Sequence, residues 1–176
     1  NAGLEELKDL PCSTADNHRV HLWVNTGLIA DVARSLDQGA EGVGLFRTEV
    51  PFLLSERFPS EHEQAEIYRE QLEAFSPLPV TMRTLDIGGD KALSYFPIKE
   101  ENPFLGWRGI RVTLDHPEIF TAQIRAMMRA SEGLANLQIM LPMVSNVNEV
   151  KLAIQLIKRA YRELVQEGLS IKYPPI

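Results

Sequence analysis

Charged side chains and glycines follow two short apolar runs of this sequence, and their types could hold an anion. The run "GVGLF" leads to Arg47, and the run "PVTM" leads to Arg83, Asp86 and then two glycines. A guanidinium fork binds a carboxylate or a phosphate through two parallel hydrogen bonds. Glycines let the backbone turn sharply or approach a ligand closely. Two arginines at neighbouring strand ends would suit a ligand with at least two anionic groups.

The same residues also fit a purely structural role. Arg83 and Asp86 stand three positions apart and could pair with each other, as could Arg47 and Glu49. The segment "DIGGDK" is not a Walker loop, because it lacks the glycine spacing and the Gly-Lys-Ser/Thr ending of that motif. The residues alone therefore leave both a phosphate site and a set of structural salt bridges open.

The elements that would carry these residues alternate between strands and helices. Short apolar runs predict strands at 19–25, 42–46, 79–86 and 137–144. Helical periodicity predicts helices over 27–39, 60–75, 117–133 and 148–168, the second of them opened by a capping box of Ser60 and Glu63. Four successive β-then-α units predict an α/β fold with a parallel sheet and right-handed crossovers.

Two architectures share this pattern, and both place the ligand site at the carboxyl ends of the strands. An open doubly wound sheet suits 176 residues, because a whole (β/α)₈ barrel needs about 250 residues. The final "SIKYPPI" instead resembles the lead into a further strand, which favours the N-terminal half of a TIM barrel. We therefore expect residues 1–18 to form a linker and residues 19–176 to form units 1–4 of a partial barrel.

Composition limits the classes of partner. The chain is 44% hydrophobic and 24% charged, as in an ordinary globular domain, and its formal net charge is −6. This balance argues against a nucleic-acid or membrane partner, since both need a summed positive field. The single cysteine, Cys12, fits a reducing compartment, and we expect the cytoplasm.

Four motifs carry a resemblance to a known family. In this order and spacing, "GAEGVGLFRTE", "TMRTLDIGGDK", "EENPFLGWRGIR" and "IMLPMV" resemble the phosphoenolpyruvate (PEP)-binding barrel of enzyme I, the PEP-protein phosphotransferase of the bacterial phosphotransferase system. PEP synthases and pyruvate phosphate dikinases share runs similar to the first motif but not "DIGGDK". The stretches "PSEHEQ" and "QIRAMMRAS" look closer to the nitrogen-branch enzyme, which would imply nitrogen regulation.

The resemblance implies roles for particular residues. Arg47 and Arg83 match the arginines that bind the PEP phosphate in the family. The resemblance also implies that four further residues support the pocket, namely Asn25, Asp86, Lys91 and Arg108. The family passes the phosphoryl group from PEP to a histidine on a separate domain and then to a phosphocarrier protein of the HPr type. In the family, a magnesium ion (Mg²⁺) bridges the phosphate and the carboxylate of PEP, and a Glu and an Asp on later barrel strands hold this ion.

The chain also departs from the family pattern. It has no match to the phosphohistidine segment, to the Mg²⁺ ligands, expected beyond Ile176, or to the late cysteine, since Cys12 stands in the wrong place. No catalytic residue is therefore expected within it. We expect a fragment that is inactive alone and that pairs with a second copy, because a half barrel exposes strand edges and an apolar inner face. A non-catalytic phosphate-ligand sensor and a dimerisation module are the alternatives.

Overall fold

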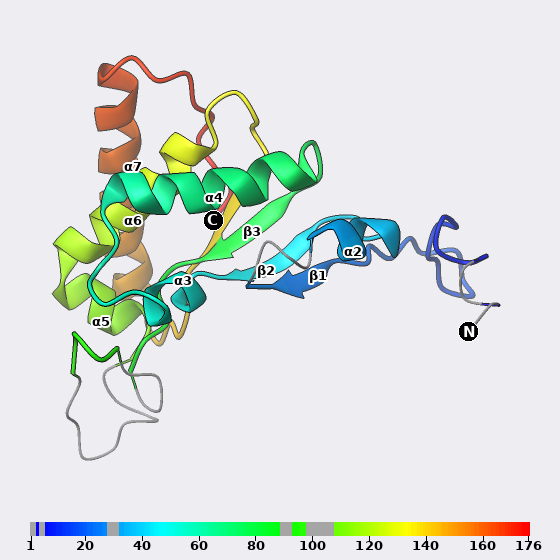
Figure 1. Ribbon diagram of the computed structural model, residues 1–176, viewed down its shortest axis with the longest axis horizontal. Helices are drawn as coiled ribbons and strands as arrows, with labels where there is room; N and C mark the ends of the chain where they lie inside the picture. Colours follow the sequence, from blue (N-terminus) through cyan, green and yellow to red (C-terminus); the bar gives the residue numbers. More distant parts are fainter. Residues whose placement is uncertain (1–2, 4–5, 28–31, 89–92, 98–107) are drawn as a thin grey trace.

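A four-stranded parallel sheet forms the centre of the molecule (Figure 1). The computed structural model describes residues 3, 6–27, 32–88, 93–97 and 108–176. The strands are β1 (Val24–Thr26), β2 (Val43–Arg47), β3 (Val80–Arg83) and β4 (Leu137–Met140), and they lie side by side in sequence order. In a doubly wound sheet, the order in which successive strands are added would reverse at an inner strand. The observed order is therefore that of an α/β barrel, over the four strands present.

Each strand is followed by at least one helix. The helices are α2 (Val32–Asp37), α3 (Glu49–Leu53), α4 (Glu61–Phe75), α5 (Ile110–Asp115), α6 (Pro117–Ala130) and α7 (Val147–Gln166). No helix in the described part of the chain is both long enough and apolar enough to cross a membrane. The β-then-α alternation predicted from the sequence is confirmed.

Helix α4 begins at the predicted capping box. The Ser60 hydroxyl accepts a hydrogen bond from the Glu63 backbone N–H at 3.2 Å, and the Ser60 N–H donates to the Glu63 carboxylate at 2.7 Å. A second capping box, of Asn146 and Glu149, opens α7. These reciprocal bonds satisfy backbone donors that a helix start leaves without partners.

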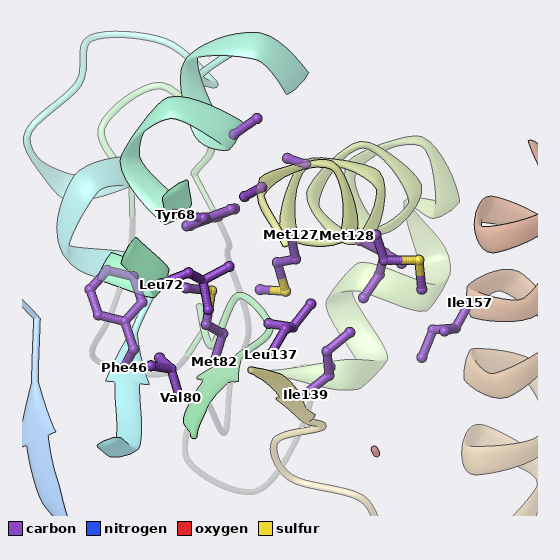
Figure 2. Close-up of a cluster of buried hydrophobic side chains, with 14 of the residues drawn as sticks. Phe46, Tyr68, Leu72, Val80, Met82, Met127, Met128, Leu137, Ile139 and Ile157 are labelled. Atoms are coloured by element: carbon purple, nitrogen blue, oxygen red, sulfur yellow. The ribbon is translucent and has the colours of Figure 1, made fainter. Parts of the chain in front are cut away.

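One face of the sheet forms the core with the long helices (Figure 2). Val80, Met82 and Ile139 point from the strands into a cluster that includes Leu72 of α4 and Met127 of α6. Because side chains alternate along a strand, the residues between them face the other way. Those residues are only partly buried, namely Thr81, Arg83, Gln138 and Met140. This second face is the one that a closed barrel turns toward its interior.

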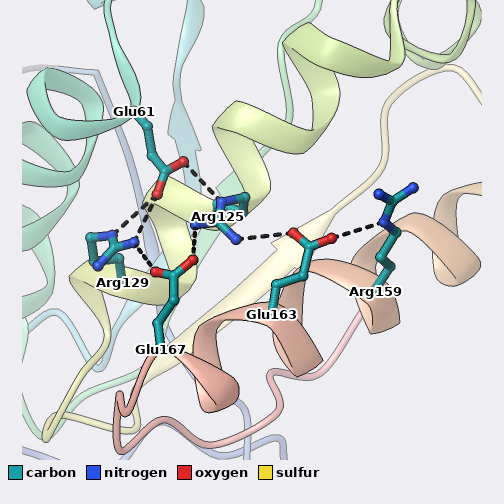
Figure 3. A network of polar contacts seen from close by, with 6 residues as sticks. All are labelled: Glu61, Arg125, Arg129, Arg159, Glu163 and Glu167. Atoms are coloured by element: carbon teal, nitrogen blue, oxygen red, sulfur yellow. Dashed lines mark hydrogen bonds and ion pairs between the residues drawn. The ribbon is translucent and has the colours of Figure 1, made fainter.

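An ionic network joins the three long helices (Figure 3). Arg125 of α6 contacts Glu61 of α4 at 2.9 Å, and it contacts Glu163 and Glu167 at the end of α7 at 3.0 and 2.6 Å. Arg129 contacts Glu61 and Glu167 at 3.1 and 2.7 Å. Two arginines of the middle helix thus hold carboxylates from both neighbours.

The segment near the C-terminus, at Pro175, lies beside β4. The Ile139 N–H donates to the Pro175 carbonyl at 2.9 Å, and the rings of Tyr161 and Tyr173 meet edge to face at 5.3 Å. The contact with Pro175 falls where a fifth parallel strand would pair with the sheet.

The structure corrects several predicted boundaries. The strand predicted at 19–25 begins only at Val24, because Val20 instead donates to the Cys12 carbonyl and Arg19 bridges to Ser13. The strand predicted at 79–86 ends at Arg83, and the one predicted at 137–144 ends before Pro142, which has no backbone donor. The short helix α3 falls where a loop was expected, and α5 precedes the helix predicted from Pro117, since five or six residues show little periodicity. Part of the helix predicted at 27–39 lies outside the described residues.

Candidate functional site

Arg47 and Arg83 lie next to each other at the carboxyl ends of β2 and β3. Their Cα atoms are register partners in the parallel ladder. Side chains at paired positions leave the same face of a sheet. The two arginines that the sequence predicted to share a site are therefore adjacent, on the face that the long helices leave uncovered.

Two buried carboxylates hold the Arg83 side chain, which is 13% exposed. Its Nη2 pairs with Glu49, and its Nη1 lies 3.3 Å from Asp86 Oδ2. The side chains of Glu49 and Asp86 are 5% and 3% exposed. The ion pair of Arg83 with Asp86 is thus present, whereas Glu49 pairs with Arg83 rather than with Arg47. The turn into α3 places Glu49 toward β3.

Asp86 is shared with a second arginine from a distant part of the chain. Arg108 Nε lies 3.3 Å from Asp86 Oδ1, and its side chain is largely buried. Arg111, one turn along in α5, instead lies 3.5 Å from Glu149 of α7. A buried carboxylate between two guanidinium groups fixes the direction of both.

Gly109 carries Arg108 to this position by bridging two strand ends. Its N–H donates to the Ile87 carbonyl at 3.0 Å, and the next residue, Ile110, donates to the Pro142 carbonyl at 3.1 Å. Its φ is +59°, and a Cβ there would lie 3.1 Å from the Pro142 oxygen and 3.0 Å from Met143 Cβ. Both the backbone conformation and the close approach require glycine at this position.

Replacing Gly109 with alanine is expected to lower the free energy of unfolding by about 2 kcal/mol, because a side chain is disfavoured at φ +59° and ψ −125° and its Cβ would also be crowded. Gly133→Ala is the matched control, since Gly133 also has a positive φ (+76°) but no atom within 4 Å of its Cβ position. Urea denaturation measures both variants. Equal losses in the two would show that the close approach at Gly109 contributes nothing.

Arg47 differs from Arg83 in having no carboxylate partner within the described ranges of the chain. It is exposed at the end of β2, and its Nε lies 3.8 Å from the position that a Cβ on Gly27 would take, just after β1. The charge of Arg83 is balanced by Glu49 and Asp86. Arg47 is therefore the guanidinium of this pair that remains available to an anion.

The other predicted site residues fall in different places. Asn25 is exposed on β1, and its register partner is Leu45, two residues before Arg47. Asn25 thus faces the same side as Arg47, one pleat back along the sheet. Lys91 lies outside the described residues, so its predicted support role stays a prediction.

Three residues at these strand ends were not predicted from the sequence as part of the site: Glu49, considered only as a possible partner of Arg47, and Thr48 and Gln123. The Thr48 hydroxyl donates to the Arg83 carbonyl at 2.6 Å, and the Gln123 amide donates to Thr48 Oγ1 at 3.1 Å. Gln123 did carry a signal, since it is a polar residue on the α6 face where Phe120 and Ile124 are fully buried. A polar side chain at a core position of a helix needs a partner, and this need indicates a buried contact.

The carboxylates of this site act as partners of arginine. Across the ranges that the structure describes, no group of three or more His, Cys, Asp or Glu residues is arranged to hold a metal ion. Glu49 and Asp86 each contact a guanidinium instead. The described geometry therefore suits an anionic ligand, and no Mg²⁺ ligand is assigned within these residues.

The chain is similar in sequence to proteins of the bacterial phosphotransferase system. The "Phosphoenolpyruvate-dependent phosphotransferase system" proteins of Salmonella typhimurium and Escherichia coli are each 49% identical to the chain, over 98% and 97% of its length. The "Phosphoenolpyruvate-protein phosphotransferase" of Haemophilus influenzae is 46% identical over 95% of the chain. The chain spans 23% of the length of the first two relatives and 29% of the third.

A family description covers almost the whole chain. The family described as "PEP-utilising enzyme, PEP-binding domain" matches residues 1–175. This range includes every strand and helix of the fold and both arginines of the site. The predicted resemblance is confirmed, and the chain belongs to the PEP-binding domain family of PEP-utilising enzymes.

Proposed function

We propose that this chain is the part of a PEP-protein phosphotransferase that binds the phosphate of PEP through Arg47 and Arg83. The observation that carries the proposal is the register of the two arginines at adjacent strand ends, with Arg83 held by carboxylates and Arg47 available. The family match and the names of the relatives support PEP as the ligand. The enzyme transfers the phosphoryl group of PEP to its own histidine and then to a carrier protein.

The residue types suit this chemistry. Phosphoryl transfer depends mainly on positioning and on cations aimed at the phosphoryl oxygens. A guanidinium group carries its charge in proteins generally, and two carboxylates hold that of Arg83 in one direction. Arg47 can close on the anion from the neighbouring strand end. In this proposal Arg108 and Asp86 keep Arg83 in place, Asn25 supports the pocket from β1, and Lys91 keeps the supporting role that the family resemblance implies.

The transferring histidine and the Mg²⁺ ligands lie outside this chain in the proposal. Mg²⁺ would supply charge neutralisation on the phosphate and carboxylate oxygens of PEP. The chain alone is proposed to bind without turnover, because its sequence has no match to the phosphohistidine segment of the family. The related PEP synthases and pyruvate phosphate dikinases are the alternative family, and the relatives' names favour the phosphotransferase.

We also propose four properties of the whole protein. It is located in the cytoplasm, has a phosphocarrier partner of the HPr type, forms a homodimer and acts in the nitrogen branch of the phosphotransferase system. The half-exposed second face of the sheet favours the association of copies, because it carries the apolar Met140 beside Thr81 and Gln138. Light scattering of this chain in dilute solution would count against association if it found monomers.

Arg47→Gln in the full-length protein tests the proposal. We expect kcat/KM for PEP-dependent phosphorylation to fall about a hundredfold, because one cation on the phosphoryl oxygens is lost. The unfolding midpoint should stay unchanged, since Arg47 is exposed and has no ion pair within the described ranges. Arg34→Gln, at an exposed arginine of α2, is the matched control. Equal activity of the two variants would refute a phosphate-binding role for Arg47.

A further inference from the structure

A buried amide lies directly beneath the strand ends that carry the site. Gln123 of α6 is fully buried, and its Oε1 accepts a hydrogen bond from the Leu85 backbone N–H at 2.7 Å. Its Nε2 donates to Thr48 Oγ1 and to the Tyr68 hydroxyl, both at 3.1 Å. Both N–H groups and the oxygen of the amide are therefore used.

These bonds hold the backbone on both sides of the charged residues. Thr48 lies between Arg47 and Glu49, and Leu85 lies directly before Asp86. The Thr48 hydroxyl also donates to the Arg83 carbonyl at 2.6 Å. One side chain from the helix layer thus ties the end of β2 to the end of β3.

The direction of each hydrogen bond is fixed by its neighbours. The Leu85 N–H needs an acceptor, which places the Gln123 oxygen toward it. The Thr48 hydroxyl already donates its proton to Arg83, so it can only accept from Gln123. Tyr68 in turn donates to Gln64, and Gln64 donates to the Pro59 carbonyl. Burial raises the pKa of the Tyr68 hydroxyl, so it keeps this proton over the whole physiological range.

Packing alone does not call for an amide at this position. Phe120, Ile124 and Met127 of α6 are buried in the same apolar cluster. A buried amide costs free energy unless its hydrogen bonds are made, whereas leucine or methionine would fill the space without that requirement. The amide has a donor and an acceptor side, and here each side meets a different strand end.

We propose that Gln123 is a positioning residue, which holds the ends of β2 and β3 so that Arg47 and Arg83 face one phosphate together. The inference rests on the proposed function for the identity of the ligand. A displacement of about 1 Å at a site of this kind can cost a large factor in rate. Gln123 touches no ligand itself and acts through Thr48 and Leu85.

The first test compares Gln123→Met with Gln71→Met in the full-length protein. Both glutamines are buried, but Gln71 Oε1 has no hydrogen-bond partner within the described residues. We expect Gln123→Met to lower kcat/KM for PEP about tenfold or more, and Gln71→Met to change it about twofold or less. Equal values of kcat/KM in two folded variants would overturn the inference.

A second pair keeps the test decisive if Gln123→Met does not fold. Thr48→Val removes the hydroxyl that links Gln123 to the Arg83 carbonyl, and Thr48→Ser keeps it. We expect serine to restore most of the kcat/KM that valine loses. Equal activity of the valine and serine variants would contradict the proposed link.

A readout without PEP separates this inference from the proposed function. Hydrogen exchange of the Leu85 amide is expected to become about tenfold faster in Gln123→Met and to stay unchanged in Gln71→Met, because only Gln123 accepts from that N–H. A wild-type protein without PEP-dependent phosphorylation would refute the proposed function alone. Unchanged exchange of Leu85 in folded Gln123→Met would refute the positioning role alone.

Discussion

Arg83→Ala is expected to lower the free energy of unfolding by about 3 kcal/mol and to reduce PEP-dependent phosphorylation by at least about a hundredfold. The loss of stability follows because two buried carboxylates, Glu49 and Asp86, lose the guanidinium that lies between them. The loss of activity follows because Arg83 is one of the two cations proposed to bind the phosphate. Urea denaturation and steady-state kinetics of the full-length protein measure the two effects.

Two further variants separate the structural role of Arg83 from its binding role. Arg83→Lys keeps the charge but cannot reach both carboxylates with a planar fork, so we expect partial stability and low activity. Arg83→Met combined with Glu49→Gln removes one buried carboxylate charge together with the guanidinium. We expect it to regain part of the stability and none of the activity. Full activity in the double variant would show that Arg83 serves the fold alone.

Arg125→Ala is expected to lower the free energy of unfolding by about 2 kcal/mol, as hydrogen bonds to charged groups are lost from a side chain that is 15% exposed. Arg125 is the common partner of Glu61, Glu163 and Glu167, which come from the helices on either side of α6. Its removal therefore loosens α4 and α7 at once. Chemical denaturation of the chain measures the change.

Arg159→Ala is the matched control for this network. Arg159 also pairs with Glu163, at 2.8 Å, but its side chain is 71% exposed and the pair lies within one helix. Exposed pairs of this kind contribute about 0.5 kcal/mol or less. A loss in Arg125→Ala no larger than in Arg159→Ala would mean that the three-helix network adds no stability beyond an ordinary surface pair.

The same network predicts a pH dependence. Hydrogen bonds from Arg125 and Arg129 lower the pKa of Glu167, and Arg159 lowers the pKa of Glu163, each from an ordinary value of 4.5. A carboxyl with a lowered folded-state pKa stabilises the fold above its ordinary pKa and loses this contribution as pH falls through the lowered value. The wild type should therefore lose stability below about pH 4.5. Arg125→Ala should lose less over the same interval, and an identical slope would contradict the prediction.

Local patterns predicted the parts of the fold that depend on neighbours in the sequence. The capping box at Ser60 follows from residues three positions apart, and the adjacency of Arg47 and Arg83 follows because parallel strands end at one edge. The α/β alternation followed from the same kind of pattern.

Contacts between distant elements could not be predicted in this way. Glu49 pairs with Arg83 rather than with Arg47, which is nearer in sequence, because the chain turns into α3 at this point. Helix α3 is too short to show periodicity in the sequence. Gln123 lies 75 residues from the Thr48 that it contacts, so only the packing of α6 under the strand ends brings them together. The partners of a charged residue depend on such packing, whereas its place at a strand end does not.

Calorimetric titration of the full-length protein with PEP tests the central claim most directly. We expect saturable binding in the wild type and in Arg34→Gln, and a loss of affinity in both Arg47→Gln and Arg83→Lys while each variant remains folded. Unchanged affinity in both Arg47→Gln and Arg83→Lys would contradict the claim, because PEP would then bind away from the ends of β2 and β3.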